Sequence, residues 1–215
     1  MMIRGHRFLL IALSLILSVL LCASAGISRP SPVTRELSQL NARYDVVIAG
    51  AGTGGTMAAV QAARLGASVL LVEDTDWIGG QMSAAAVTSM DEGPPGTPFG
   101  EGRPGVRDRG LYREFHERAL RHYDNAGISV DTCYFSTGRF AVEPRVGQSI
   151  LYDMLQDASL SATLHVALCT SASAVLRDAN QVTGIELLQD LGNVPSRRTV
   201  NCTVLVDATE LGDLL

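Results

Sequence analysis

The distribution of apolar residues along the chain predicts an alternation of strands and helices. Residues 69–72 form a continuous apolar run without polar alternation, which is typical of a parallel strand covered on both faces. Another short apolar run ends at residue 49, and an alanine-rich stretch over residues 53–65, closed by Gly66, lies between the two. This order predicts a βαβ unit with a parallel sheet.

Two later segments have helical spacing. In the first, apolar side chains recur at helical intervals from Leu111 to Tyr123, and oppositely charged residues lie four positions apart, as in Arg113/Glu117. We interpret it as an amphipathic helix whose charged face is solvated and is not a binding patch. Pro144 suits the first turn of the second helix. Its expected buried stripe consists of Val146, Ile150, Leu151, Met154 and Leu155.

Four strand-like runs follow the second helix. They cover residues 164–168, 172–177, 182–188 and 199–206, and the polar residues 178–181 predict a turn between the second and third runs. The alternative is that these runs form a separate small sheet.

The junction between the first strand and the first helix is rich in glycine. Its sequence is Gly50-Ala51-Gly52-Thr53-Gly54-Gly55, and G-x-G-x-x-G between a strand and a helix is typical of a dinucleotide-binding turn. We assign Gly50 to the tight turn, Gly52 to the close approach of a pyrophosphate and Gly55 to close packing of the helix. The amides and dipole of the helix N-terminus would face the phosphates. A βαβ unit without a ligand is the alternative.

An acidic pair ends the second strand. Glu73 follows Gly50 at about the spacing of 20 at which a carboxylate accepts hydrogen bonds from a ribose hydroxyl. Asp74 adds a charge that would repel a 2′-phosphate, so NADP is disfavoured. We expect Glu73→Ala to weaken cofactor binding without disturbing the fold. The alternative is that Glu73 only caps the strand end and that Asp74 or a backbone group recognises the ribose.

A second glycine pair makes the cofactor prediction more specific. Gly79 and Gly80, followed by Gln81 and Met82, resemble the pair that follows the first βαβ unit in FAD enzymes of the glutathione-reductase-like fold. Residues 76–82, 90–93, 140–146 and 206–213 resemble successive signatures of a bacterial FAD-dependent oxidoreductase family. The resemblance covers most of residues 44–215. Within the last signature, Glu210 stands where the commoner flavoprotein form D-A-T-G has glycine.

The resemblance implies both a fold and a function. The fold is an α/β Rossmann-like FAD-binding domain, in which a central parallel sheet is flanked by helices and joined to a β-meander, and we expect this chain to hold it incompletely. FAD would bind without a covalent link and support redox chemistry on a small organic substrate. A non-catalytic nucleotide-binding fragment, or a pseudoenzyme that keeps the Rossmann core, is the alternative. The resemblance places the second glycine segment near the flavin, the adenine near Ala172, and three residues of the last signature at the cofactor: Asp207, Ala208 and Thr209.

The N-terminus has the pattern of a signal peptide. Arg4 and Arg7 precede an apolar core over residues 8–21, and Ala23-Ser24-Ala25 is a small-residue cleavage site. We expect export of the protein, periplasmic or secreted, although residues 8–25 could instead be an uncleaved membrane anchor. The predicted organisation is a signal peptide at 1–25, a linker at 26–43 and the FAD domain at 44–215. That domain includes a Gly/Pro-rich loop at 88–110, interpreted as a lid or a disordered insertion.

Composition excludes several other functions. The net charge of −5 is unsuited to binding nucleic acid by phosphate neutralisation. All 17 basic residues are arginine, so no lysine can form a Schiff base. The cysteines lack C-x-x-C spacing, which indicates neither a metal site nor a redox dithiol; Cys169 and Cys202 are expected to pack near strand ends. His116 and His122 are interpreted as surface or rim histidines without metal partners.

Overall fold

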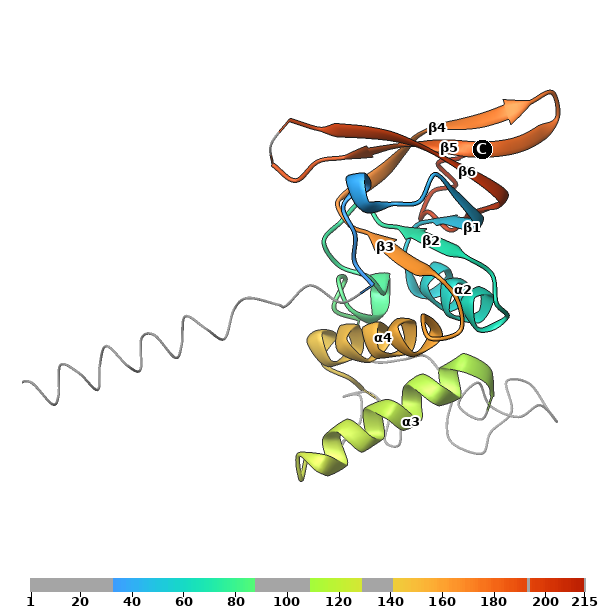
Figure 1. Ribbon diagram of the computed structural model, residues 1–215. Helices are drawn as coiled ribbons and strands as arrows, with labels where there is room; N and C mark the ends of the chain where they lie inside the picture. The colour runs from blue at the N-terminus through green and yellow to red at the C-terminus, as the bar shows by residue number, and fades with distance from the viewer. Residues whose placement is uncertain (1–32, 88–108, 129–140, 193, 215) are drawn as a thin grey trace, which may run out of the picture. The chain divides into compact units, whose positions relative to one another are not determined.

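The computed structural model describes residues 33–87, 109–128, 141–192 and 194–214 (Figure 1). Within the unit Pro32–Leu215 it confirms the predicted α/β class, with a parallel sheet, flanking helices and a β-meander. The elements in chain order are η1 (Leu37–Gln39), β1 (Arg43–Ala49), α2 (Thr53–Arg64), β2 (Val69–Val72), η2 (Gly80–Met82), α3 (Gly110–Asn125), α4 (Pro144–Ala158), β3 (Leu164–Ala167), β4 (Thr170–Asp178), β5 (Gln181–Gln189) and β6 (Ser196–Asp207).

The six strands in the described part of the chain belong to one sheet of order β3-β2-β1-β6-β5-β4. The pairs β3–β2, β2–β1 and β1–β6 are parallel, whereas β6–β5 and β5–β4 are antiparallel. Strand β6 belongs to both parts, because Ser196–Asn201 pairs with β5 and Asn201–Asp207 pairs with β1. The four late runs therefore do not form a separate sheet, and β6 carries the chain from the meander back to the parallel strands.

The parallel strands are buried on both faces by different partners. Ile48, Val69 and Leu71 pack in one apolar cluster with α2 and α4, while Val47 and Leu70 pack in another with η1 and the meander. All four residues of β2 are buried. Figure 1 shows the same arrangement, with the meander on one side of β1–β3 and the helices on the other. The continuous apolar runs of the sequence thus reflect burial of these strands on both faces of the sheet, as expected.

The helices form two successive layers below the sheet (Figure 1). Helix α2 buries its small-residue face, including Ala59 and Ala63, and α4 buries Ile150, Leu151, Met154 and Leu155. Of the predicted stripe of α4, Val146 is only half-buried, and Gly147 is buried in its place. Helix α3 packs against α4 through its apolar stripe, and the charged face predicted for α3 forms the ion pairs Arg113–Glu117 and Glu114–Arg118.

Two predictions require correction. Residues 33–43 are not a free linker, because Val33, Leu37 and Leu40 are buried and the Arg35 amide donates to the Val166 carbonyl over 2.8 Å. His116 is not a surface residue: it is 8% exposed and lies on the inner side of α3.

Several predicted segments lie outside the described residues. They are residues 1–25, most of the loop at 88–110 and the signature at 90–93. No helix within the described part of the chain combines the length and apolarity needed to cross a membrane.

Candidate cofactor site

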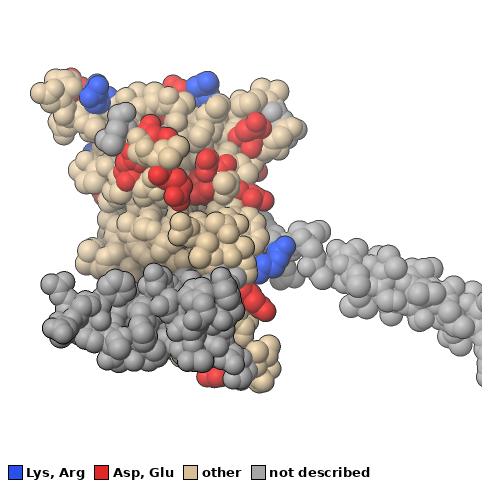
Figure 2. Space-filling view, turned by 180° about the vertical axis from the view of Figure 1, so that it is seen from behind, with Lys and Arg blue, Asp and Glu red and all other residues tan. Residues whose placement is uncertain are grey.

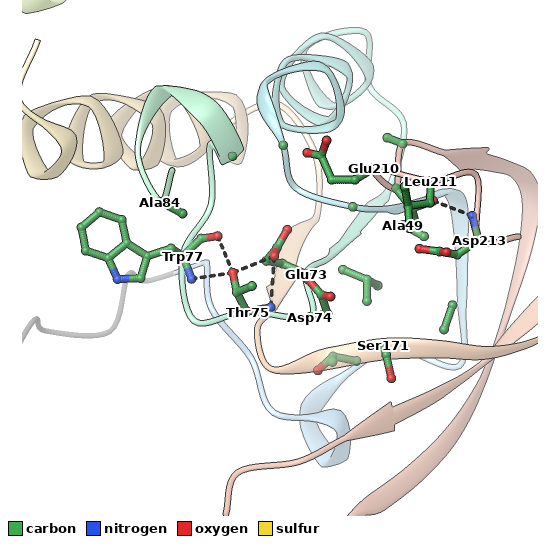
Figure 3. Close-up of a pocket in the computed structure, with 18 residues that line it drawn as sticks. Ala49, Glu73, Asp74, Thr75, Trp77, Ala84, Ser171, Glu210, Leu211 and Asp213 are labelled. Carbon is green, nitrogen blue, oxygen red and sulfur yellow. Dashed lines mark hydrogen bonds between the residues drawn. The ribbon is translucent and has the colours of Figure 1, made fainter. Parts of the chain in front are cut away.

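A cavity of about 530 Å³ lies at the ends of the parallel strands, where the sheet meets the start of the meander. This volume is in the usual range for a small-molecule site, and the carboxyl ends of parallel strands are where α/β sheets bind ligands. Its walls come from the glycine turn, the end of β2, the second glycine segment, the start of β4 and the turn after β6 (Figure 3).

The glycine turn has the conformation assigned from the sequence. Gly50 has φ +94°, and a Cβ placed on it would lie 2.3 Å from the Ala208 carbonyl oxygen. A Cβ on Gly55 would lie 1.9 Å from the Gly50 carbonyl oxygen, so α2 can begin against the turn only without a side chain there. Gly52 instead faces open space that is limited only by the Glu210 carboxylate. Gly50 and Gly55 therefore have the steric roles expected of them, and the approach of a pyrophosphate to Gly52 stays a prediction.

Hydrogen bonds join the glycine turn to the second glycine segment. The Gly79 amide donates to the Ala51 carbonyl over 2.7 Å, and the Thr53 hydroxyl donates to the Gly79 carbonyl over 3.1 Å. Gly79 and Gly80 both have positive φ, which lets the chain turn tightly here. Segments that are distant in sequence thus form one wall, and Gly80 from the second segment lines the cavity.

The Glu73 carboxylate is buried, and both of its oxygens accept hydrogen bonds from within the protein. Its Oε2 accepts a hydrogen bond from the Ala51 amide over 2.8 Å, and its Oε1 accepts from the Thr75 amide over 3.0 Å. Burial raises the pKa of Glu73, and the hydrogen bonds from Thr75 and Ala51 oppose that shift. The expectation that Glu73 supports little structure was wrong, since it ties β2 to the glycine turn. The proposed ribose contact stays a prediction, and Asp74, which is exposed on the same wall, offers a second carboxylate.

The turn after β6 is organised by Asp207. Its Oδ1 accepts from the Thr209 amide and hydroxyl, and its Oδ2 accepts from the Leu214 amide. These hydrogen bonds, with that from the Thr209 hydroxyl first, lower the pKa of Asp207. Ala208, Thr209 and Glu210 are thereby held along the cavity, whereas Asp207 supports the turn from behind.

The cavity brings together half of the residues predicted for the site. Those that line it are Gly50, Gly52, Glu73, Asp74, Gly80, Ala172, Ala208 and Thr209. Those that stand behind or beside it are Ala51, Thr53, Gly54, Gly55, Gly79, Gln81, Met82 and Asp207.

Several lining residues were missed by the sequence analysis: Thr75, Trp77, Ala84, Thr170, Ser171, Leu211 and Asp213. Some of them could have been found by their closeness in sequence to predicted site residues. Thr75 and Trp77 lie between the acidic pair and the second glycine segment, and Thr170 and Ser171 directly precede Ala172. Trp77 is held by Arg145 of α4, whose guanidinium carbon lies 5.6 Å from the ring centroid.

The electrostatics of the cavity are acidic. Glu73, Asp74, Glu210 and Asp213 line it, and none of its described lining residues is basic. Acidic side chains also gather across one face of the molecule in Figure 2. An anionic ligand here must therefore be held by backbone amides and the α2 dipole. The residues fit a dinucleotide on steric grounds, because the start of α2 is uncapped by any side chain and a Cβ on Gly54 would meet no atom within 4 Å.

Comparisons with known proteins identify the family of this chain. Residues 45–215 match the family described as FAD dependent oxidoreductase. The chain belongs to this family, and FAD is its cofactor. The described part of the chain shows no cluster of metal-ligating side chains. The family match does not favour the alternative of a non-catalytic nucleotide-binding fragment.

Individual relatives share only part of their length with this chain. The digeranylgeranylglycerophospholipid reductase of Methanocaldococcus jannaschii is 44% identical over 57 residues, which are 26% of this chain and 15% of the reductase. A triple mutant of the flavin-dependent brominase Bmp2 has 18% identity and a TM-score of 0.50, over 77% of this chain and 38% of the brominase. The THI4 protein of Thermovibrio ammonificans has 18% identity and a TM-score of 0.49, over 94% and 65% of the two chains. The likeness to the brominase indicates the fold alone.

Proposed function

We propose that the protein is an oxidoreductase that uses FAD to oxidise or reduce a small organic substrate, and that the cavity holds the ADP half of FAD. The observation that carries this proposal is the cavity at the glycine turn, open at Gly52 and walled by the acidic pair at the end of β2. When bound, the flavin supplies the hydride or electron transfer.

The chain's own residues bind and orient the cofactor in this proposal. The first-turn amides of α2 donate hydrogen bonds to the pyrophosphate. A remaining lone pair of Glu73, or the exposed Asp74, accepts a hydrogen bond from the adenosine ribose. Ala172 and its neighbours at the start of β4 leave space for the adenine. Gly80 lies on the flavin side of the cavity.

A graded series at Gly52 tests this placement in the full-length protein. Gly52 has φ −59°, so other residues can adopt its backbone conformation, and a side chain there would enter the cavity. We expect the wild type to show flavin absorbance or to take up added FAD. Affinity should fall from wild type to Gly52→Ala and further to Gly52→Val, while circular dichroism reports an intact fold. A wild type that neither carries flavin nor takes up FAD would sink the proposal.

We also propose that the protein is exported through residues 1–25. The charged start, apolar core and small-residue site of this segment support the proposal. Mass spectrometry of the protein recovered from its host is expected to find a mature N-terminus near Gly26. Recovery of the intact N-terminus in the membrane fraction would support the anchor at residues 8–25, and intact protein in the cytoplasm would contradict both readings.

A further inference from the structure

Glu210 places a negative charge at the end of the cavity beside the glycine turn, where the proposed function places the pyrophosphate. We call this the phosphate end of the cavity. Its Oε1 would lie 3.4 Å from a Cβ on Gly52 and 3.6 Å from a Cβ on Gly80. Figure 3 shows the Glu210 side chain directed toward the start of α2. The carboxylate therefore stands between the two glycine segments.

The backbone amides at the start of α2, which can donate hydrogen bonds to an anion, lie at this end of the cavity. The first amides of an α-helix have no partner within the helix, and Gly52 supplies no side-chain cap to those of α2. The positive end of the helix dipole attracts any nearby carboxylate. The Glu210 carboxylate and a pyrophosphate would thus compete for the same backbone amides of α2.

Among the residues that the structure describes, the lining of the cavity gives the two anions no shared cation. None of the described residues lining the cavity is basic, and three further carboxylates line it. Two like charges that lie close together repel each other, and the repulsion is stronger where the effective dielectric constant is below that of water. Glu210 is exposed, so its side chain can turn toward solvent when an anion enters.

We propose that Glu210 is an internal competitor of the cofactor's pyrophosphate. Its carboxylate occupies the phosphate end of the cavity in the free protein, lowers the affinity for FAD, and turns outward when FAD binds. This inference rests on the proposed function, because it assigns a role to a residue of the same site. A glycine at this position, as in D-A-T-G, would leave the amides of α2 free for the phosphates.

The opposite role would change affinity in the opposite direction. If Glu210 accepted a hydrogen bond from a hydroxyl of the bound cofactor, loss of its charge would weaken binding. The sign of the effect of Glu210→Gln thus separates a competitor from a ligand-holding residue.

The test is calorimetric titration of the full-length apoprotein with FAD, ADP and adenosine at low and high salt. The variants are Glu210→Gln, which removes the charge, and Glu210→Ala, which also removes the volume. Asp178→Asn is the matched control, because it makes the same change in net charge at an exposed position at the end of β4, away from the cavity. Circular dichroism verifies the fold of each protein.

We expect both Glu210 variants to bind FAD and ADP about tenfold more tightly than the wild type at low salt. The gain should shrink at high salt, because salt screens exposed charges. Adenosine, which has no phosphate, should bind all proteins equally, and Asp178→Asn should match the wild type.

Unchanged or weaker binding of FAD by Glu210→Gln would overturn the inference and leave the proposed function intact. An equal gain for adenosine would also overturn it, because the effect would not depend on phosphate. If neither the wild type nor the variants bound FAD or ADP, the inference and the proposed function would fail together.

Discussion

The parallel half of the sheet and the meander bury their side chains to very different extents. Every residue of β2 is buried, and the buried residues of β1 include Val47, Ile48 and Ala49. In β4, by contrast, only Thr170 is buried among nine residues, and β5 buries mainly one face. The parallel half therefore forms the core, while the meander is a cover with one face in solvent.

The cavity lies where these two regions meet. The parallel half contributes the tight geometry of the glycine turn and the acidic pair, and the start of the meander contributes the wall from Thr170 to Ala172. Substitutions in the first region should therefore disturb the fold and the site together. Substitutions on the outer surface of the second region should disturb neither.

The largest effect is expected for Gly55→Ala in the parallel half. The added Cβ would lie 1.9 Å from the Gly50 carbonyl oxygen, so α2 would have to move away from the turn. We expect a loss of about 3 kcal/mol or more in the free energy of unfolding, measured by urea denaturation. Gly54→Ala is the control, because its Cβ meets no atom within 4 Å; it should be neutral or stabilising by less than about 1 kcal/mol. Equal stability of the two variants would contradict this packing.

The second effect concerns Glu73→Ala. Removal of the carboxylate leaves the buried Ala51 amide without its acceptor, so we expect a loss of about 2 kcal/mol in unfolding free energy and FAD binding at least about tenfold weaker. Asp74→Asn should leave stability unchanged, because Asp74 is exposed. Wild-type stability of Glu73→Ala would show that the internal hydrogen bonds contribute little.

The behaviour of Glu73 marks a limit of sequence reasoning about this site. Spacing after Gly50 correctly placed the carboxylate at the cavity. Spacing could not show that its oxygens bond to Ala51 and Thr75, because those bonds depend on how the loop after β2 turns back. The place of the carboxylate at the cavity was predictable from the sequence, but its internal hydrogen-bond donors were not.

The fold itself was predictable where burial controls the pattern. The continuous run at Val69–Val72 and the stripe of α4 follow directly from their buried environments. The double role of β6 was harder to foresee, because the change from antiparallel to parallel pairing occurs within one strand at Asn201. Burial of Val33, Leu37 and Leu40 also escaped prediction, since these few apolar side chains fill gaps that only the assembled sheet creates.

A medium effect that depends on pH is expected at Glu114, which connects the helices below the parallel half. Its carboxylate accepts two hydrogen bonds from Arg64 of α2, of 2.6 and 2.8 Å, and pairs with Arg118, which also contacts Asp157 of α4. The Arg64 guanidinium, followed by Arg118, holds the pKa of Glu114 below its usual range. Because the folded-state pKa is lowered, the stabilisation is present above the unfolded-state pKa and is lost as pH falls through the folded-state value.

Thermal unfolding as a function of pH measures this contribution. The free energy of unfolding of the wild type should exceed that of Glu114→Gln by about 1 kcal/mol at neutral pH, since the Glu114 carboxylate is only partly exposed. The difference should begin to shrink at about pH 4.3, the usual pKa of a glutamate, and should disappear as the pH falls through the lowered folded-state pKa of Glu114. A difference that persisted at the acid end would mean that packing, and not charge, connects the helices.

The smallest effect is expected for Glu186→Gln in the meander, which sharpens the comparison because this carboxylate is also paired with an arginine. Its Oε1 lies 2.6 Å from Arg197 and accepts a hydrogen bond from Ser173, and these two partners lower the pKa of Glu186. Arg197 is exposed, however, and the Glu186 side chain is 36% exposed, so water already solvates the ion pair well. We expect the melting temperature of Glu186→Gln to match the wild type at neutral pH within experimental error, and to remain so at high salt. A decrease as large as that of Glu114→Gln would show that the exposed meander depends on its polar contacts as strongly as the helices of the parallel half do, and the distinction between core and cover would then fail.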